Sequence, residues 1–136
     1  IYDNGKIYID DYAHHPTEIN AVISSIKTFY PEKKLLVVFQ PHLFSRTRDF
    51  VDDFAKSLSQ SEELILLDIY PARELPIPGI TSQYLLDMIQ NDQKYLLTTD
   101  EVLPFIEQHK PDVLLTMGAG NIDRLVSKIE GAFSGI

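Results

Sequence analysis

The chain has 136 residues, 44% of them hydrophobic and 24% charged, which is ordinary for one globular domain with one core. Its formal net charge of -8 disfavours a nucleic acid or an anionic membrane as a partner, because both require a basic face. Having no cysteine, it cannot form disulfides or thiolate metal sites, and no apolar run resembles a membrane span or signal peptide. Since it begins at Ile1 without methionine, we expect a domain cut from a longer protein.

The first predicted strand covers residues 6–9, and an Asn-Gly turn at residues 4–5 predicts a short antiparallel hairpin at its edge. The strand leads into Asp10-Asp11-Tyr12-Ala13-His14-His15, which places two acids, a tyrosine and two histidines within six positions. An amphipathic helix pattern follows over residues 19–30. Ionisable groups concentrated between a strand and a helix indicate a binding loop, because a core would reject them.

The rest of the chain repeats this alternation. Further β-rich runs cover residues 35–39, 64–67, 95–97 and 113–115, and helical stripes cover residues 50–58, 84–89, 102–106 and 122–129. The second, third and fifth runs are continuously apolar, which is typical of parallel strands covered on both faces. We therefore predict an α/β fold: a doubly wound, mostly parallel open sheet, Rossmann-like, of five to six strands with helices on both faces.

One loop is unusually long and rich in proline. Residues 70–79 contain three prolines, which forbid a helix or a central strand there. Long ordered loops are often functional, so this segment is a candidate part of a site.

Polar residues follow every predicted strand. Ligands of open α/β sheets bind outside the carboxyl ends of the strands, where these residues should converge. The candidates are Asp10, Asp11, Tyr12, His14, His15, Gln40, His42, Ser45, Arg46, Arg48, Asp68, Tyr70, Arg73, Glu74, Thr98, Thr99, Asp100, Gly118, Ala119, Gly120 and Asn121.

Individual features of this set allow more than one interpretation. We place Arg46 and Arg48 at a helix start, where the macrodipole disfavours cations, so their presence indicates an anionic partner. The Gly118-Ala119-Gly120 segment fits either backbone N–H groups near an anion or a tight turn. Asp11 fits either a ligand contact or a turn cap.

Two other classes of function remain as alternatives. A metal site would use Asp10, Asp11, His14, His15 and His42, but their spacing matches no known ligand motif, and we expect none. A receiver-like phosphoacceptor signalling domain would place acids after the first and third strands and a threonine after the fourth, as here. It would also need a lysine after the fifth strand, where this chain has Thr116-Met117-Gly118.

Three segments carry a resemblance to one enzyme family. Residues 10–18, residues 40–42 with 45–49, and residues 116–122 resemble the C-terminal domain of Mur ligases, above all those that join L-alanine to UDP-N-acetylmuramate. A sister branch that recycles murein tripeptide shares the first segment and differs in the second. The resemblance spans essentially the whole chain. It departs at Ala13, where glycine is common, and at Leu43, where arginine is common.

The resemblance implies an ATP-dependent carboxylate–amine ligase of peptidoglycan synthesis, cytoplasmic, that forms an acyl phosphate. Residues 1–136 would be its C-terminal domain, and the N-terminal UDP-binding and central ATPase domains would lie outside this chain. No G-x-x-x-x-G-K-[ST] phosphate loop is present, so we expect the isolated domain to be inactive and Mg²⁺ to be held mainly outside it. The partners would be ATP, L-alanine, UDP-N-acetylmuramate and the central domain.

The resemblance also implies residue roles. His42 and Arg46 would hold the L-alanine carboxylate or the acyl-phosphate charge as the catalytic pair. Asp11 would accept hydrogen bonds from the ribose of ATP, beside Tyr12, His14 and His15. The amino-acid pocket would be bordered by Arg48, Tyr70, Arg73, Gly118, Ala119, Gly120 and Asn121.

Overall fold

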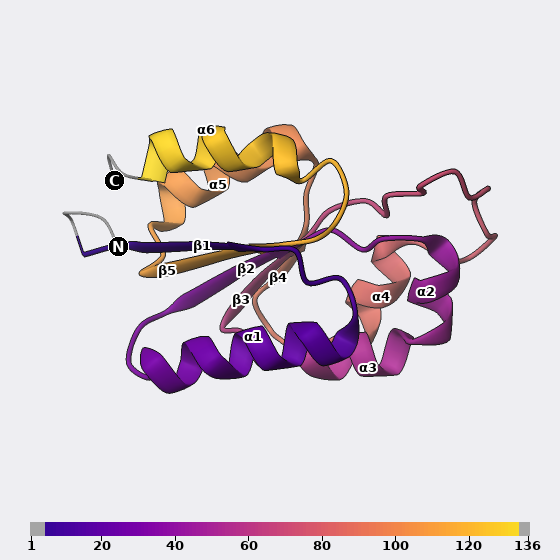
Figure 1. The fold of residues 1–136 in the computed structure, drawn as a ribbon, viewed down its shortest axis with the longest axis horizontal. Helices are drawn as coiled ribbons and strands as arrows, with labels where there is room; N and C mark the ends of the chain where they lie inside the picture. The colour runs from indigo at the N-terminus through magenta and orange to yellow at the C-terminus, as the bar shows by residue number, and fades with distance from the viewer. Residues whose placement is uncertain (1–4, 134–136) are drawn as a thin grey trace.

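A five-stranded parallel sheet forms the centre of the computed structural model, which describes residues 5–133 (Figure 1). Its strand order is β1-β5-β2-β3-β4. The strands are β1 (Ile7–Asp11), β2 (Leu35–Phe39), β3 (Glu63–Leu66), β4 (Lys94–Leu96) and β5 (Val113–Met117). The predicted hairpin at the amino end of β1 depends on residues 1–4, which lie outside the described residues.

Helices cover both faces of the sheet, as predicted. One face carries α1 (Pro16–Phe29), α3 (Val51–Leu58) and α4 (Ser82–Met88), and the other carries α5 (Thr99–His109) and α6 (Asp123–Phe133). The short helix α2 (Phe44–Asp49) lies beyond the sheet, next to the proline-rich loop (Figure 1). Residues 70–79 contain neither a helix nor a strand, as their prolines predicted.

The core is divided by the sheet into two apolar clusters. Ile19, Phe39 and Phe54 belong to the cluster under α1, α3 and α4, and Val38, Ile106 and Ile129 belong to the cluster under α5 and α6. Every residue of β2 and β5 is buried, because alternate side chains of a central strand enter the two clusters. The doubly wound parallel fold is therefore confirmed.

The topology creates a crevice at the carboxyl ends of two neighbouring strands. β2 leads to α3 on one face, whereas its neighbour β5 leads to α6 on the other face. The loops after β2 and β5 therefore diverge, and such a switch point is where open α/β sheets bind ligands.

A buried charge lies at the opposite, amino-terminal edge of the sheet. Glu63 begins β3 with only 1% of its surface exposed, and its carboxylate forms an ion pair with Lys34. The close contact with the Glu63 carboxylate is the main reason that the pKa of Lys34 is raised, against the lowering effect of desolvation. This pair compensates a carboxylate that would otherwise be costly to bury.

Candidate functional site

The two acids at the end of β1 have different environments. β1 extends through Asp10 and Asp11, beyond its predicted end, because these residues pair with Thr116 and Met117 of β5. Thr116 Oγ1 donates a hydrogen bond to Asp10 Oδ1 at 2.7 Å, which gives that carboxylate a partner within the sheet. Asp11 instead accepts a hydrogen bond from the backbone N–H of Ala13 at 2.8 Å with one oxygen and thus closes a turn. Each acid thus uses one carboxylate oxygen, Asp10 toward the neighbouring strand and Asp11 in the turn that leads to His14.

His15 has a structural role that the sequence did not reveal. It is the N-cap of α1: its Nδ1 accepts from the Thr17 N–H at 3.4 Å, and its own N–H donates to Glu18 Oε1 at 3.2 Å. This reciprocal arrangement is a capping box. The His15 ring also contacts Phe50, with 5.0 Å between ring centroids. These contacts fix the position of His15 at the start of α1.

His42 lies at the centre of a cluster of four side chains. Arg46 Nη1 lies 3.1 Å from His42 Nδ1, the Tyr70 ring stacks on the imidazole at 5.7 Å between centroids, and the His14 ring meets it edge-on at 5.8 Å. The pKa of His42 is lowered, first by burial and then by the charges of Arg46 and His14, with Glu74 opposing them. His42 is therefore neutral at neutral pH, so Nδ1 accepts from Arg46 and the proton resides on Nε2.

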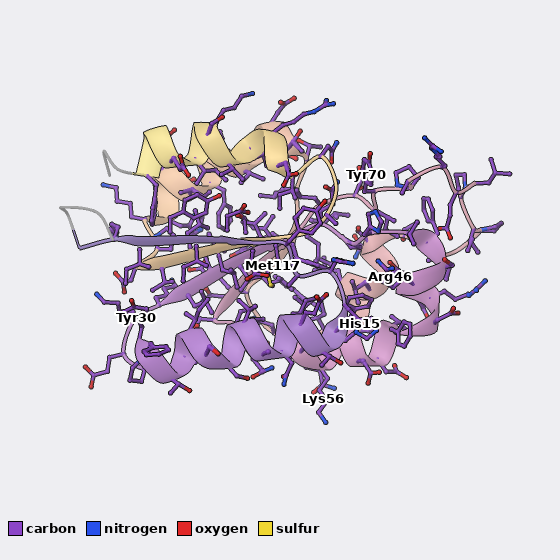
Figure 2. The ribbon with its side chains drawn as sticks, viewed as in Figure 1. His15, Tyr30, Arg46, Lys56, Tyr70 and Met117 are labelled. Carbon is purple, nitrogen blue, oxygen red and sulfur yellow. The ribbon has the colours of Figure 1, made fainter. Side chains whose placement is uncertain are left out.

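The two arginines lie before the predicted helical stripe of residues 50–58, in a separate six-residue helix that begins at Phe44, so that Arg46 is the third residue of α2. They occupy the last turn of α2, and Phe50 separates this helix from α3. In so short a helix these residues lie close to both ends, so the helix dipole gives no argument for or against an anionic partner. Arg48 is exposed and pairs with Asp49 at 2.8 Å, whereas Arg46 is half-buried against His42. Figure 2 shows Arg46 and Tyr70 close to the carboxyl edge of the sheet.

The proline-rich loop is fixed against α2 by hydrogen bonds. Glu74 accepts from the backbone N–H of Ser45 at 3.1 Å and from the Ser45 hydroxyl. The hydroxyl contact is the main reason that the pKa of Glu74 is lowered. The backbone N–H of Leu43 donates to the carbonyl of Tyr70 at 2.8 Å. These contacts hold Tyr70 over His42, while Arg73 is exposed in a turn with a φ of 77°.

Gln40 is a residue of the site to which the sequence assigned no role. It is 4% exposed and follows β2 directly. Its Nε2 donates to the carbonyl of Asp68 at 3.2 Å and to Asn121 Oδ1 at 2.5 Å, and its Oε1 accepts from the Ile122 N–H at 2.9 Å. One buried amide thus connects the loops after β2, β3 and β5 at the switch point. The sequence contained one signal for this role, because Gln40 is a side-chain amide that directly follows a fully apolar strand.

Close packing explains the two glycines after β5. A Cβ at Gly120 would lie 2.6 Å from Cγ of Tyr70 and 2.7 Å from Oε1 of Gln40. Gly118 has a φ of 146°, and a Cβ there would lie 3.0 Å from the Gln40 carbonyl oxygen. Both positions need glycine because another chain segment approaches closely. The packing brings Tyr70, Gln40 and the turn of residues 118–121 together.

The structure therefore unites only part of the predicted set. His14, His42, Arg46 and Tyr70 form one cluster, and the His14 ring also meets the 63% exposed Tyr12 at 6.1 Å. Arg48 and Arg73 are exposed at its margin. Among residues 5–133, no three His, Asp or Glu side chains gather closely enough to hold a metal ion. None of the helices within that range could cross a membrane.

The strand order excludes the receiver-like alternative. Receiver domains have the order 2-1-3-4-5, in which the first and third strands are neighbours. Here β1 is an edge strand, and β5 and β2 separate it from β3. Asp11 and Asp68 therefore cannot form an acidic pocket on adjacent strands, and the receiver hypothesis is wrong.

Comparisons with known proteins agree with the fold and the motifs. Residues 1–120 match the family model described as Mur ligase, glutamate ligase domain. A UDP-N-acetylmuramate–L-alanine ligase of Flavobacterium psychrophilum is 57% identical over 124 residues, covering 91% of this chain and 28% of the relative. The chain thus spans just over a quarter of the length of that relative.

Two solved structures share the fold at low identity. The UDP-N-acetylmuramate-alanine ligase of Thermotoga maritima superposes with a TM-score of 0.66 and 24% identity, covering 97% of this chain and 29% of that one. A murein peptide ligase of Psychrobacter arcticus gives a TM-score of 0.70 and 21% identity, covering 95% and 28%. These likenesses support the architecture alone.

Proposed function

The chain belongs to the Mur ligase family, and from that premise we propose that it is the C-terminal domain of an ATP-dependent enzyme joining L-alanine to UDP-N-acetylmuramate. UDP-binding and ATPase domains would be supplied by the rest of the full-length protein, and the reaction would serve peptidoglycan synthesis in the cytoplasm. The observation that carries the proposal is the cluster of Arg46, His42 and Tyr70 at the switch point. The proposal is also supported by relatives of this chain that are named UDP-N-acetylmuramate–L-alanine ligase.

Arg46 and His42 have the donors that an amino-acid carboxylate requires. A guanidinium has five N–H donors in a planar fork, and the contact with His42 occupies one of its nitrogen atoms. Neutral His42 adds its Nε2 proton as a second donor. Arg46 thus supplies the positive charge for the L-alanine carboxylate or for a developing acyl-phosphate charge. Tyr70, packed against Gly120, would form the wall of the amino-acid pocket.

The residues after β1 fit the nucleoside part of ATP. Asp11 uses one carboxylate oxygen for its turn, and the second oxygen can accept from a ribose hydroxyl. Tyr12 offers an exposed ring beside it, and His14 connects this segment to His42. ATP would supply the phosphoryl group that activates the muramate carboxylate, with Mg²⁺ held mainly by the other domains. The chain by itself is therefore expected to be inactive.

Phosphate release by the full-length protein tests this function. The assay supplies ATP, Mg²⁺, UDP-N-acetylmuramate and L-alanine, and then omits each in turn. We expect steady release only when all are present. Release that continues without L-alanine, or that never requires the muramate nucleotide, would contradict the proposal.

A further inference from the structure

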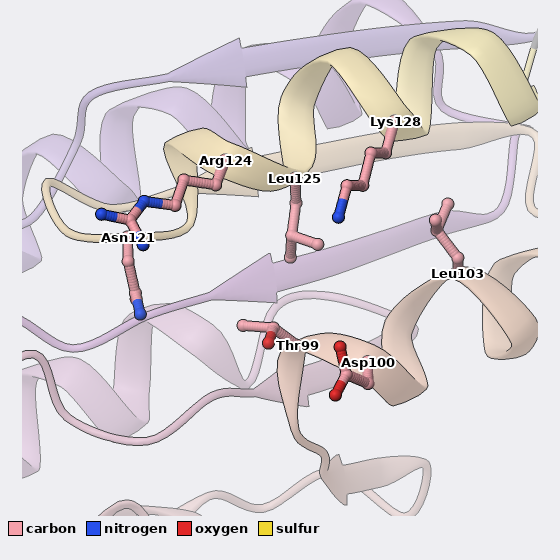
Figure 3. A pocket seen from close by; sticks show the side chains of 7 residues that line it. All are labelled: Thr99, Asp100, Leu103, Asn121, Arg124, Leu125 and Lys128. Carbon is pink, nitrogen blue, oxygen red and sulfur yellow. The ribbon is translucent and has the colours of Figure 1, made fainter.

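A cavity lies between α5 and α6, outside the His42 cluster. Its volume is about 250 Å³, and Arg124 and Lys128, one helical turn apart on α6, line it together with Thr99 and Asp100 of α5. Figure 3 shows the Lys128 side chain directed into the space between the helices and the Arg124 side chain extending toward Asn121 at one end of it. One water occupies roughly 30 Å³ in the liquid, so the cavity has room for a small polyatomic anion and several waters.

The charge in this cavity is opposite to that of the chain. The formal net charge is -8, yet two cations here face one carboxylate, Asp100. Neither Arg124 nor Lys128 forms an ion pair with any of residues 5–133. Leu103 and Leu125 line the same space, and apolar walls strengthen electrostatic attraction by excluding water. Among the described residues that line it, the cavity therefore has one more positive than negative charge.

Asn121 provides neutral donors at one end of the cavity. Its Oδ1 accepts from Gln40 Nε2 at 2.5 Å, which leaves the Asn121 amide N–H groups for another partner. Asn121 lines the cavity next to Arg124 (Figure 3). A guanidinium, an ammonium, an amide and the Thr99 hydroxyl together match a tetrahedral oxyanion with several acceptor oxygens.

We propose that this cavity binds a phosphate-type anion, carried either by inorganic phosphate or by a phosphate monoester. The inference depends on Arg124, Lys128, Asn121 and Thr99 and does not rest on the proposed ligase function. Gln40 connects Asn121 to the loops of the switch point, so an anion here contacts the framework of the main site without entering it.

The test is a calorimetric titration of the full-length protein with inorganic phosphate. A saturating non-hydrolysable ATP analogue fills the nucleotide site first, and ionic strength is held constant with chloride. The cavity variant is Arg124→Gln with Lys128→Gln. The matched control is Lys33→Gln with Lys56→Gln, which removes the same charge from two exposed positions elsewhere.

We expect phosphate to bind the wild type and the control equally and the cavity variant about tenfold more weakly, as expected for lost charge-assisted hydrogen bonds. Equal affinity in all three proteins, or no binding to the wild type, would overturn the proposal. A titration with methyl phosphate distinguishes inorganic phosphate from a phosphate monoester as the ligand. Binding as tight as that of phosphate would show that the site accepts a monoester, and loss of binding would show that it accepts only the free anion. Crystals soaked in tungstate should show density between Arg124 and Lys128, and density only elsewhere would also overturn it.

Discussion

Arg46 Nη1 and His42 Nδ1 lie 3.1 Å apart, which ties α2 to the segment that leaves β2. The contact needs a neutral imidazole, because a protonated Nδ1 could not accept from a guanidinium. Burial and the charge of Arg46 both act in that direction and lower the pKa of His42. The pair thus presents one permanent cation and one neutral donor to the crevice.

The protonation of His42 can be measured directly. In an NMR titration of the four histidines, the pKa of His42 should lie below its ordinary value of 6.5. Arg46→Met should raise it, since a neighbouring positive charge is removed, and the exposed Arg48→Met is the control that should leave it unchanged. A His42 pKa at or above 6.5, or equal shifts in both variants, would contradict the geometry.

The same shift has a defined effect on stability. Because the pKa of His42 is lower in the folded state, the folded chain binds fewer protons than the unfolded chain below pH 6.5. The contribution of neutral His42 to the free energy of unfolding is complete above pH 6.5, and it is lost as the pH falls through the pKa of His42 in the folded chain. Urea unfolding of His42→Gln should therefore show a weaker loss of stability on acidification than the wild type does.

Gly120 should not tolerate a side chain. Gly120→Ala places a Cβ 2.6 Å from Tyr70 Cγ, so Tyr70 or the turn must move, at a cost of about 1–3 kcal/mol in the free energy of unfolding. Gly131→Ala is the matched control in α6, where a Cβ meets nothing within 4 Å and helix propensity favours alanine by up to about 1 kcal/mol. Denaturant unfolding of both variants measures the difference. Similar changes in the two would show that the turn is loosely packed.

The buried Glu63 should depend on Lys34. Lys34→Met leaves the carboxylate unpaired, and since the Lys34 side chain is 46% exposed and solvent screens the pair, we expect a loss of only about 1–2 kcal/mol. Adding Glu63→Gln should restore most of it, because the buried charge is then absent. The exposed neighbour Lys33→Met should have little effect. Failure of the second substitution to recover stability would show that the cost is not electrostatic.

The sequence predicted the fold well because burial leaves a local pattern. The uninterrupted apolar runs of β2 and β5 identified central parallel strands, and parallel strands bring their carboxyl ends to one edge. The pairing of β1 with β5 was not visible locally, and it brings Thr116 to the carboxylate of Asp10. The role of Gln40 was equally hidden, since its partner Asn121 is 81 residues away.

The helix boundary near the arginines was missed for a similar reason. The start of α2 is held by the proline-rich loop, because the backbone N–H of Ser45 in its first turn donates to Glu74, 29 residues away. The N-cap role of His15 was not predicted because histidine is an unusual N-cap residue, although Glu18 three positions later was a signal for a capping box.

Asp11 can be separated from its neighbour by kinetics in the full-length enzyme. Asp11→Ala should raise the KM for ATP, and Asp11→Asn should also raise it, although the amide oxygen can still close the turn with Ala13. Asp10→Ala is the control, because Asp10 is bound by Thr116 within the sheet and should leave the KM for ATP unchanged. An unchanged KM for ATP in Asp11→Asn would show that Asp11 closes the turn and does not contact the nucleotide.

The most direct test of the central claim is the kcat/KM for L-alanine of the full-length Arg46→Ala variant. We expect it to fall about 10²-fold, the loss typical of one donor that stabilises developing charge. Lys56→Ala, on the exposed surface of α3 and pointing away from the cluster (Figure 2), should keep the wild-type value. An unchanged kcat/KM in Arg46→Ala would contradict the assignment of the His42–Arg46 pair to the amino-acid site.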